Sequence, residues 1–310
     1  MAHKIPVIVN SSGGTARKLG DKLEPQLRAA FQAAGGEPDL ALVEGGDIAK
    51  AIERARGAAV VAVGGGDGTQ SGAAQVLAGS DTALAVLPLG TLNHLAKQIG
   101  VPADLEGAVK VAVSGRVERI DVARVGDIVF VNNASIGLYT RMVRHRDASR
   151  LPKWLATLPA AWTVLAQMKL KPICIDIGDG PQEIVSPLLF VGNNRYSYEG
   201  RTLGQRESMT DGVLSVYAVA PKTRAQLFGF AMRALVGRAD PEHDFEALAE
   251  VEHFTVSGEG SIWVAHDGEV ERMALPLEFR IMPRALAVMV PADAPATSGA
   301  AIEQPDQANR

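Results

Sequence analysis

A glycine-rich turn between a short apolar run and a helical pattern constrains this chain more than any other feature of its sequence. Residues 59–63 (AVVAV) form an apolar run of strand length, and residues 64–69 (GGGDGT) follow it directly. Glycines let backbone N–H groups approach an anion without interference from a Cβ atom, and the helix that follows aims its free N–H groups at the same point. The turn therefore predicts a strand that ends at a phosphate site.

Two more turns have the same design. Residues 88–94 (PLGTLNH) follow the apolar run 83–87 (ALAVL), and residues 10–18 (NSSGGTARK) follow the run 5–9 (IPVIV). Tight chain reversal alone also selects glycine, so a single turn of this kind is a weak signal. Three of them would meet at one edge of a parallel sheet, where the ligands of open α/β folds bind. The sequence thus predicts a nucleotide site at that edge.

The style of the sequence changes near residue 117. Before it, short apolar runs alternate with helical patterns, as in the βαβ units of a doubly wound sheet. After it, strand-like segments joined by glycine-containing turns predominate, which favours antiparallel sheets. We therefore expect an N-terminal doubly wound α/β nucleotide-binding domain over residues 1–120 and a C-terminal antiparallel β-sandwich domain over residues 121–283.

Other segments of the second half have a different character. Helical patterns interrupt the strand-like segments near residues 151–169 and 225–236. Residues 293–310 are rich in Ala, Pro, Ser, Gln and Asn and have no apolar periodicity, so we expect a disordered tail there.

Composition excludes several classes of function. The chain has 310 residues, of which 21% are charged, and a net charge of −4, which argues against a general nucleic-acid binder. The single cysteine, Cys174, excludes an internal disulfide framework and a zinc site of several thiolates. The N-terminal apolar run is too short for the core of a signal peptide, so we expect a cytoplasmic protein.

Phosphoryl transfer fits the glycine-rich turns better than other nucleotide chemistry. A Walker P-loop needs Gly followed by Lys and Ser or Thr, and the sequence contains no such motif. A dinucleotide fingerprint needs spaced glycines in the first turn between strand and helix, and Gly13 and Gly14 lack that spacing. Phosphoryl transfer needs backbone amides, a carboxylate that holds Mg²⁺ and a base for the attacking hydroxyl group. Asp67 fits the role of metal ligand.

Two further carboxylates end a strand-like run in the second half of the chain. Residues 266–269 (HDGE) place Asp267 and Glu269 two positions apart. Asp-Gly is also a preferred pair in the tight turns of β-hairpins. The residues alone therefore leave two interpretations open, a hairpin turn and a pair of catalytic carboxylates.

Three motifs, taken in order, resemble those of the diacylglycerol kinase catalytic-domain family, which includes bacterial lipid kinases and sphingosine kinases. They are residues 65–69 (GGDGT), 88–93 (PLGTLN) and 267–269 (DGE). The resemblance extends from Asn10 to about Pro291. It implies ATP in the cleft between two domains and transfer of its γ-phosphate to a lipid hydroxyl group, on diacylglycerol or a sphingoid-like acceptor. It also implies that residues 284–292 return to the first domain.

The resemblance further implies a role for individual residues. Asp267 would be the general base, and Glu269 its neighbour at the Mg²⁺ ion or the hydroxyl group. Arg17 or Lys18 would neutralise phosphate charge, although two solvated basic residues at the start of a helix are the plainer interpretation. The residues expected to line the nucleotide are Asn10, Gly14, Gly65, Gly66, Asp67, Gly68, Thr69, Gly90, Thr91 and Asn93.

Two departures from the family pattern keep other functions open. The family commonly has Pro where this chain has Ser11, and an acidic residue where it has His94. Loss of the acidic residue bears on the handling of metal or nucleotide. One alternative is a soluble-substrate kinase related to NAD kinase, which has a similar Gly-Gly-Asp-Gly sequence. The other is a catalytically weak regulator that binds a nucleotide or a lipid.

An uncharged stretch from Trp154 to Met168 offers a way to reach a lipid. It contains Pro159 and, at about 15 residues, is too short to span a bilayer. Cationic residues flank it on both sides, a combination typical of an interfacial segment that docks on anionic lipid. Peripheral contact with the inner face of the membrane is therefore one hypothesis, and an apolar helix buried on the second domain is the other. A homodimer is left open.

Overall fold

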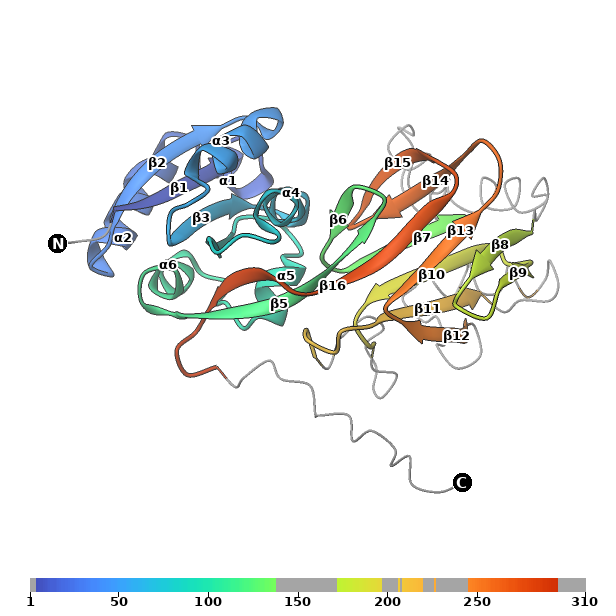
Figure 1. Cartoon of the computed structure of the whole chain (residues 1–310). Coiled ribbons are helices and arrows are strands. Elements are labelled where there is room, and N and C mark those ends of the chain that lie inside the picture. Colours follow the sequence, from blue (N-terminus) through green and yellow to red (C-terminus); the bar gives the residue numbers. More distant parts are fainter. Residues whose placement is uncertain are drawn as a thin grey trace, which may run out of the picture.

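Two β-sheets organise the protein, as the computed structural model shows (Figure 1). The structure describes residues 4–137, 172–196, 206, 208–219, 226 and 245–294. One sheet has ten strands and extends through both halves of the described chain, and the other has six strands and belongs to the second half. None of the helices in these ranges is both long enough and apolar enough to cross a bilayer.

The first domain is a parallel sheet with helices on its faces. In spatial order its strands are β2 (Glu37–Val43), β1 (Lys4–Asn10), β3 (Val60–Gly65) and β4 (Ala83–Pro88). Between them run α1 (Gly14–Leu19), η1 (Gly20–Lys22), α2 (Leu23–Ala33), η2 (Gly45–Asp47), α3 (Ile48–Ala55) and α4 (Asp67–Leu77), and α5 (His94–Gln98) and α6 (Leu105–Ser114) follow β4. Helix α3 packs beside α4 and α2 beside α6, so the inner strands β3 and β4 are apolar almost throughout, as expected for a covered parallel sheet.

The second domain is a β-sandwich. The six-stranded sheet has the order β12 (Phe245–Val251), β11 (Leu214–Val219), β10 (Leu188–Asn193), β7 (Asn133–Gly137), β14 (Ser261–His266) and β15 (Glu269–Ala274), and its neighbouring strands are antiparallel. The facing layer consists of β5 (Arg116–Val125), β6 (Ile128–Phe130), β8 (Ile173–Asp176), β9 (Pro181–Ile184), β13 (His253–Ser257) and part of β16 (Leu277–Val290).

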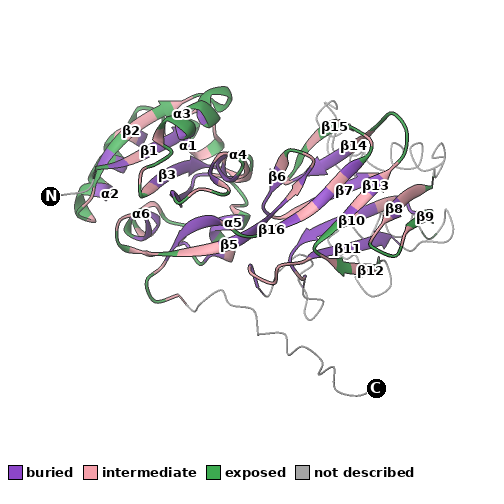
Figure 2. Ribbon diagram, viewed as in Figure 1, coloured by how far each residue is buried: buried purple, intermediate pink, exposed green. Residues whose placement is uncertain are grey.

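Apolar side chains from both layers form one core between them. Phe254 and Phe279 of one layer stack with their ring centroids 4.7 Å apart, and Val191 and Val264 of the other layer belong to the same buried cluster. Figure 2 shows buried residues along the strands of both domains. The predicted fold class, a doubly wound α/β domain followed by an antiparallel β-sandwich, is therefore confirmed.

The two domains share β5 and β16. The first part of β16 pairs with β13, and its last part reaches the first domain, where Val288 lies opposite Leu84 of parallel β4. Strand β5 pairs antiparallel with β16 over most of its length, with a register shift between Met282 and Leu286. One continuous two-stranded ribbon thus lies in the sheets of both domains.

The second domain contains strands that the sequence pattern did not reveal. Strands β9, β12 and β15 carry many polar residues, and the side chains of β9 are largely exposed, so they lack an apolar run. The helical patterns near residues 151–169 and 225–236, the uncharged stretch from Trp154 to Met168 and the tail beyond residue 294 lie outside the described residues.

Candidate functional site

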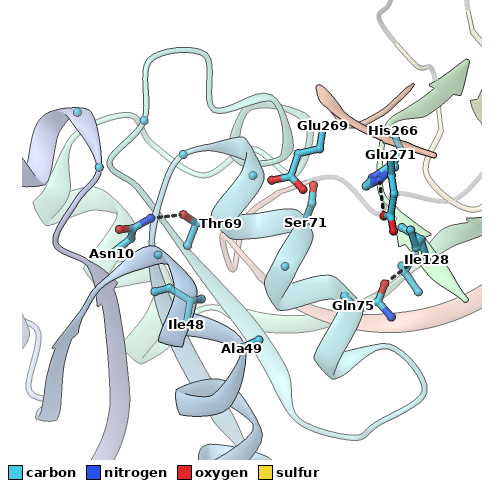
Figure 3. Close-up of a pocket in the computed structure, with 18 of the residues that line it drawn as sticks. Asn10, Ile48, Ala49, Thr69, Ser71, Gln75, Ile128, His266, Glu269 and Glu271 are labelled. Atoms are coloured by element: carbon cyan, nitrogen blue, oxygen red, sulfur yellow. Dashed lines mark hydrogen bonds and ion pairs between the residues drawn. The ribbon is translucent and has the colours of Figure 1, made fainter. Parts of the chain in front are cut away.

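A cavity of about 800 Å³ opens where the carboxyl ends of the parallel strands face the second domain (Figure 3). The first domain contributes its glycine-rich turns and one face of α4, and the second contributes β6 and the hairpin of β14 and β15. The lining residues are Asn10, Gly13, Gly14, Gly45, Ile48, Ala49, Gly66, Gly68, Thr69, Ser71, Gly72, Gln75, Gly90, Thr91, Ile128, Val129, His266, Glu269 and Glu271.

Glycines let the turns after β3 and β4 touch each other directly. A Cβ atom on Gly90 would lie 2.3 Å from the Cα of Gly66, a distance that no side chain tolerates. By contrast, a Cβ atom on Gly14 or Gly72 would meet nothing within 4 Å. Close backbone packing therefore explains Gly90, whereas a Cβ atom on Gly66 would lie 3.4 Å from the Gly90 Cα, at ordinary contact distance. Gly14 and Gly72 leave open space on the side of the cavity.

The turn after β1 is tied to the start of α4 by Asn10. Its Nδ2 donates a hydrogen bond to Thr69 Oγ1 at 3.1 Å, and its Oδ1 accepts one from the N–H of Ser12 at 3.0 Å. A Cβ atom on Gly65 would lie 2.4 Å from the same Thr69 Oγ1. Glycine at position 65 therefore makes room for the threonine that Asn10 binds.

The carboxylate of Asp67 caps α5 rather than lining the cavity. Its Oδ2 accepts a hydrogen bond from the N–H of Asn93 at 3.1 Å, and its Oδ1 accepts one from the N–H of His94 at 2.6 Å. Asn93 has a positive φ of 52°, and its Oδ1 accepts from the N–H of Gly90 at 2.9 Å. Asp67 and Asn93 thus fix the shape of the turn after β4, and the role of Asp67 as a metal ligand stays a prediction.

Asp267 occupies the two-residue turn of the hairpin between β14 and β15. Asp267 and Gly268 have φ values of 46° and 91°, as in the type I′ turns that join tightly paired strands. The hairpin interpretation of Asp-Gly therefore holds for the backbone. The side chain does something else, because it points to the junction of the two domains.

Four donors surround the carboxylate of Asp267. Its Oδ2 accepts hydrogen bonds from the hydroxyl group of Ser71 and the N–H of Val131, both at 2.7 Å. Its Oδ1 accepts from the N–H groups of Asn132 at 2.8 Å and Asn133 at 3.2 Å. Ser71 belongs to α4 and the other donors to the chain leading into β7, so Asp267 binds both domains at once.

The hairpin also brings acidic side chains to the cavity. Glu269 lies over the start of α4, close enough that a Cβ atom on Gly68 would be 3.2 Å from its Oε1. The buried side chain of His266 lies with its Nε2 atom 4.0 Å from Glu271 Oε2. Figure 3 shows Glu269 above Ser71, and His266 and Glu271 at the end of the cavity beside Ile128.

The structure brings most of the predicted site residues together. Asn10, Gly14, Gly66, Gly68, Thr69, Gly90, Thr91 and Glu269 line the cavity. Gly65, Asp67, Asn93 and Asp267 support these residues from behind through the contacts described above. Arg17 is exposed on α1 and does not line the cavity.

Sequence reasoning missed several lining residues, and for two groups of them the signal was present. Ser71, Gly72 and Gln75 follow Gly68 at helical spacing, so the face of α4 that continues from Gly68 was predictable. Gly45, Ile48 and Ala49 follow the carboxyl end of β2, at the same sheet edge as the other turns. Ile128 and Val129 carry no polar signal, and only the tertiary fold places them here.

The cavity has the size and the backbone donors that an anionic ligand needs. Its volume lies within the range of small-molecule sites, and the N-terminus of α4 opens onto it. Among the described residues that line it there is no Lys or Arg, whereas Glu269 and Glu271 are both present. In the described ranges no group of three or more His, Cys, Asp or Glu side chains is arranged to hold a metal ion.

A buried polar cluster joins the two domains. Asp121 of β5 accepts hydrogen bonds from the N–H groups of Arg284 at 2.7 Å and Gly212 at 2.8 Å. Burial raises the pKa of Asp121 above its ordinary value, against the opposing effect of these hydrogen bonds. The guanidinium group of Arg206 donates to the carbonyl oxygen of Val131 at 2.7 Å and to Gln98 of α5, and burial lowers the pKa of Arg206.

Two family models match the chain in succession. The model described as the diacylglycerol kinase catalytic domain matches residues 4–125. The model described as the YegS C-terminal NAD kinase beta sandwich-like domain matches residues 132–290. Between them they cover most of both domains and every cavity-lining residue except Ile128 and Val129.

Curated relatives and solved structures agree with these matches. A protein of Klebsiella pneumoniae named "probable lipid kinase YegS-like" is 32% identical over 285 residues, which is 88% of this chain and 93% of that protein. A protein of Mycobacterium tuberculosis named "diacylglycerol kinase" is 30% identical over 270 residues, 82% of this chain and 85% of that protein. The crystal structure of a diacylglycerol kinase from Bacillus anthracis has the same fold, with a TM-score of 0.65 and 21% identity over 93% of this chain and 96% of that one.

Proposed function

The chain belongs to the diacylglycerol kinase catalytic-domain family, and on this premise we propose that it transfers the γ-phosphate of ATP to the hydroxyl group of a lipid in the presence of Mg²⁺. The observation that carries the proposal is the composition of the cavity. Glycine-rich turns and a helix N-terminus form one wall, and two carboxylates and the Asp267 hairpin form the other. Phosphate would bind at the first wall and the reacting hydroxyl group near the second.

ATP would lie along the turns after β1, β3 and β4. Backbone N–H groups at the start of α4 and the turn glycines would bind its phosphates. The open space beside Gly14 and Gly72 would admit the nucleotide without displacing a side chain. Thr69 and Thr91 line the same wall and would contribute hydroxyl donors.

Mg²⁺ would be held by Glu269 together with the phosphates of ATP. The described lining has carboxylates and no Lys or Arg, so ATP alone would face uncompensated repulsion from Glu269 and Glu271. Bound there, Mg²⁺ supplies positive charge that neutralises the phosphates and so assists transfer. Glu269 is thus proposed as the ligand of Mg²⁺, whereas the sequence predicted Asp67 in that role and Glu269 at the ion or the hydroxyl group.

Asp267 would act as the base for the acceptor hydroxyl group. Its position between the domains, where it accepts a hydrogen bond from the cavity-lining Ser71, supports this role. The acceptor is proposed to be a lipid because relatives that overlap most of the chain are named lipid kinase or diacylglycerol kinase. A soluble acceptor such as NAD is the competing proposal, and the family model of the sandwich domain refers to NAD kinase in its description.

The test is transfer of labelled γ-phosphate from ATP and Mg²⁺ to a panel of diacylglycerol, sphingoid bases, phospholipids and NAD. The wild type is compared with Asp267→Asn and, as a matched control, Asp179→Asn, because Asp179 and Gly180 form another exposed Asp-Gly turn in the described chain. A labelled lipid from the wild type and the control, absent with Asp267→Asn, is the expected result. Label in NAD alone would replace the lipid by a soluble acceptor, and ATP binding without any labelled product would favour the regulator.

Access to a lipid surface is proposed to come from the stretch between Trp154 and Met168. This stretch lies outside the described residues, so the support is its sequence alone. Flotation with liposomes that contain anionic lipid tests it on the full chain. We expect binding to fall when Trp154 and Trp162 are both changed to Ser, and unchanged flotation would overturn the proposal.

A further inference from the structure

Ser71 stands between Asp267 and the cavity. Its side chain projects from α4 and lines the cavity, whereas Asp267 is not among the lining residues. The Ser71 hydroxyl group donates a hydrogen bond of 2.7 Å to Asp267 Oδ2 across the domain junction. Figure 3 shows Ser71 on the cavity side of α4 beside Glu269. A hydroxyl group that enters the cavity therefore meets the serine before it meets the aspartate.

The hydrogen bonds of Asp267 leave no place for a further donor. An ionised carboxylate offers about four lone-pair positions. Ser71 and the N–H groups of Val131, Asn132 and Asn133 supply four donors, two to each oxygen. A base must accept a proton from its substrate within hydrogen-bonding distance. Asp267 can do so directly only if one of these donors leaves.

Ser71 can connect the acceptor hydroxyl group to Asp267 while its own hydrogen bond to Asp267 stays in place. A serine hydroxyl group has one proton to donate and two lone pairs with which to accept. While its proton is bound to Asp267, its oxygen remains free to accept a hydrogen bond from an acceptor hydroxyl group in the cavity. The three backbone donors belong to the chain at the start of β7 and cannot play this part, because an N–H group has no lone pair to offer.

We propose that Ser71 is a catalytic residue that relays the proton of the acceptor hydroxyl group to Asp267. The O–H bond of the acceptor breaks and its proton passes to Ser71 Oγ, while the original Ser71 proton passes to Asp267 Oδ2. The acceptor oxygen forms its bond to the γ-phosphorus as the bond from that phosphorus to the β,γ-bridging oxygen breaks. ADP departs with the electron pair, Ser71 is restored, and protonated Asp267 returns its proton to water.

The relay rests on the proposed function. Three variants distinguish a failure of the relay from a failure of the proposed function. Ser71→Ala removes the hydroxyl group, Ser71→Thr keeps one on the same helix, and Asp267→Asn removes the base. Under single-turnover conditions with the labelled acceptor, we expect Ser71→Ala to lower the transfer rate by about 10²-fold or more. The KM for ATP should stay within about twofold of wild type, and Ser71→Thr should recover most of the rate.

A purely structural role for Ser71 would give a different set of results. The wild-type rate in mixtures of H₂O and D₂O should depend on deuterium content along a curve, because two protons move in one step, and Ser71→Ala should give a straight line. A linear wild-type dependence, or Ser71→Ala above about a tenth of the wild-type rate while Asp267→Asn is inactive, would overturn the relay and leave the kinase intact. Full activity of Asp267→Asn would instead overturn the proposed base. If Ser71→Ala fails to fold, the wild-type deuterium dependence and Ser71→Thr still decide.

Discussion

The carboxylate of Asp67 accepts a hydrogen bond of 2.6 Å from the backbone N–H of His94, the first residue of α5. The aspartate of the turn after β3 therefore holds the turn after β4 in place. The donor in this hydrogen bond is the backbone N–H of residue 94, which is present whatever side chain that residue has. This relationship explains why histidine can stand where the family commonly has an acidic residue without loss of the turn.

We expect loss of the Asp67 cap to destabilise the fold. Asp67→Ala removes the acceptor of two backbone N–H groups and should lower the free energy of unfolding by about 1–2 kcal/mol. Asp67→Asn keeps one acceptor oxygen and should cost less. Urea unfolding followed by circular dichroism measures both changes.

Asp104→Ala is the matched control for this cap. Asp104 caps α6 by accepting from the N–H of Gly107 at 2.7 Å, away from the cavity. Both alanine variants should lose stability, and only Asp67→Ala should also weaken ATP binding, because its cap supports Gly90 and Thr91. Unchanged stability of Asp67→Ala would contradict the capping role.

Gly90→Ala should lower the free energy of unfolding more than Gly14→Ala, a change in the turn after β1. The new Cβ atom would lie 2.3 Å from the Gly66 Cα, and two backbone segments cannot move apart without disturbing the sheet edge. A loss of about 3 kcal/mol in the free energy of unfolding is expected. Gly14→Ala, where a Cβ atom meets nothing within 4 Å, should stay within about 0.5 kcal/mol of wild type. Equal effects of the two changes in thermal unfolding would refute the close approach.

Gln75 should contribute to the docking of the two domains. Its Nε2 donates to the carbonyl oxygen of Asp127 at 3.0 Å, and its Oε1 accepts from the N–H of Val129 at 2.6 Å, so one side chain binds the backbone on both sides of Ile128. Gln75→Ala should lower the free energy of unfolding by about 1–2 kcal/mol. Gln26→Ala, an exposed change on α2, is the comparison and should have little effect. Chemical unfolding that fails to separate these two variants would argue against the contact.

Asp121 should give the protein a specific dependence of stability on pH. Burial raises the pKa of this carboxyl group in the folded state above its ordinary 3.8. The folded state therefore holds the proton more tightly than the unfolded chain, and this contribution is fully present below 3.8 and is lost as pH rises through the raised pKa. The free energy of unfolding of the wild type, minus that of Asp121→Asn, should therefore be largest near pH 3.8 and should fall as the pH rises.

Urea unfolding of both proteins at several pH values between about 3.5 and 7 measures this difference. Asp21→Asn, an exposed change of the same kind on η1, controls for the altered net charge. The contrary outcome is that the two proteins differ in free energy of unfolding by the same amount at every pH, or by an amount that favours the wild type more as pH rises. Either result would show that the burial of the carboxyl group does not govern its protonation.

The first domain was largely predictable because its signals are local. Apolar runs of strand length, each followed by a glycine-rich turn, determine both the parallel sheet and the edge at which its ligands bind. The same logic placed Asn10, Gly66 and Thr69 at one cavity. Ser71 escaped because a serine in a helix carries no signal of its own, and only its position one turn after Gly68 marks it.

The second domain was predictable in class and less so in detail. Strands such as β9 and β15 form by pairing with neighbours and carry polar residues on their exposed faces, so their sequences lack an apolar run. The partners of Asp267 could not be derived either. Val131 and Ser71 are separated from it by 136 and 196 residues, and nothing in the sequence near any of the three announces the contact.

The ribbon of β5 and β16 means that this chain has no severable halves. A fragment ending at residue 125, where the first family model ends, would leave β4 and β5 with the edges that β16 covers in the whole protein. Unpaired edges of that kind promote aggregation. The same two strands connect the domains on either side of the cavity, so the cavity could widen only if this hydrogen-bonded ribbon bent. The stiffness of the ribbon, rather than the length of a linker, would then limit the size of the acceptor that can enter.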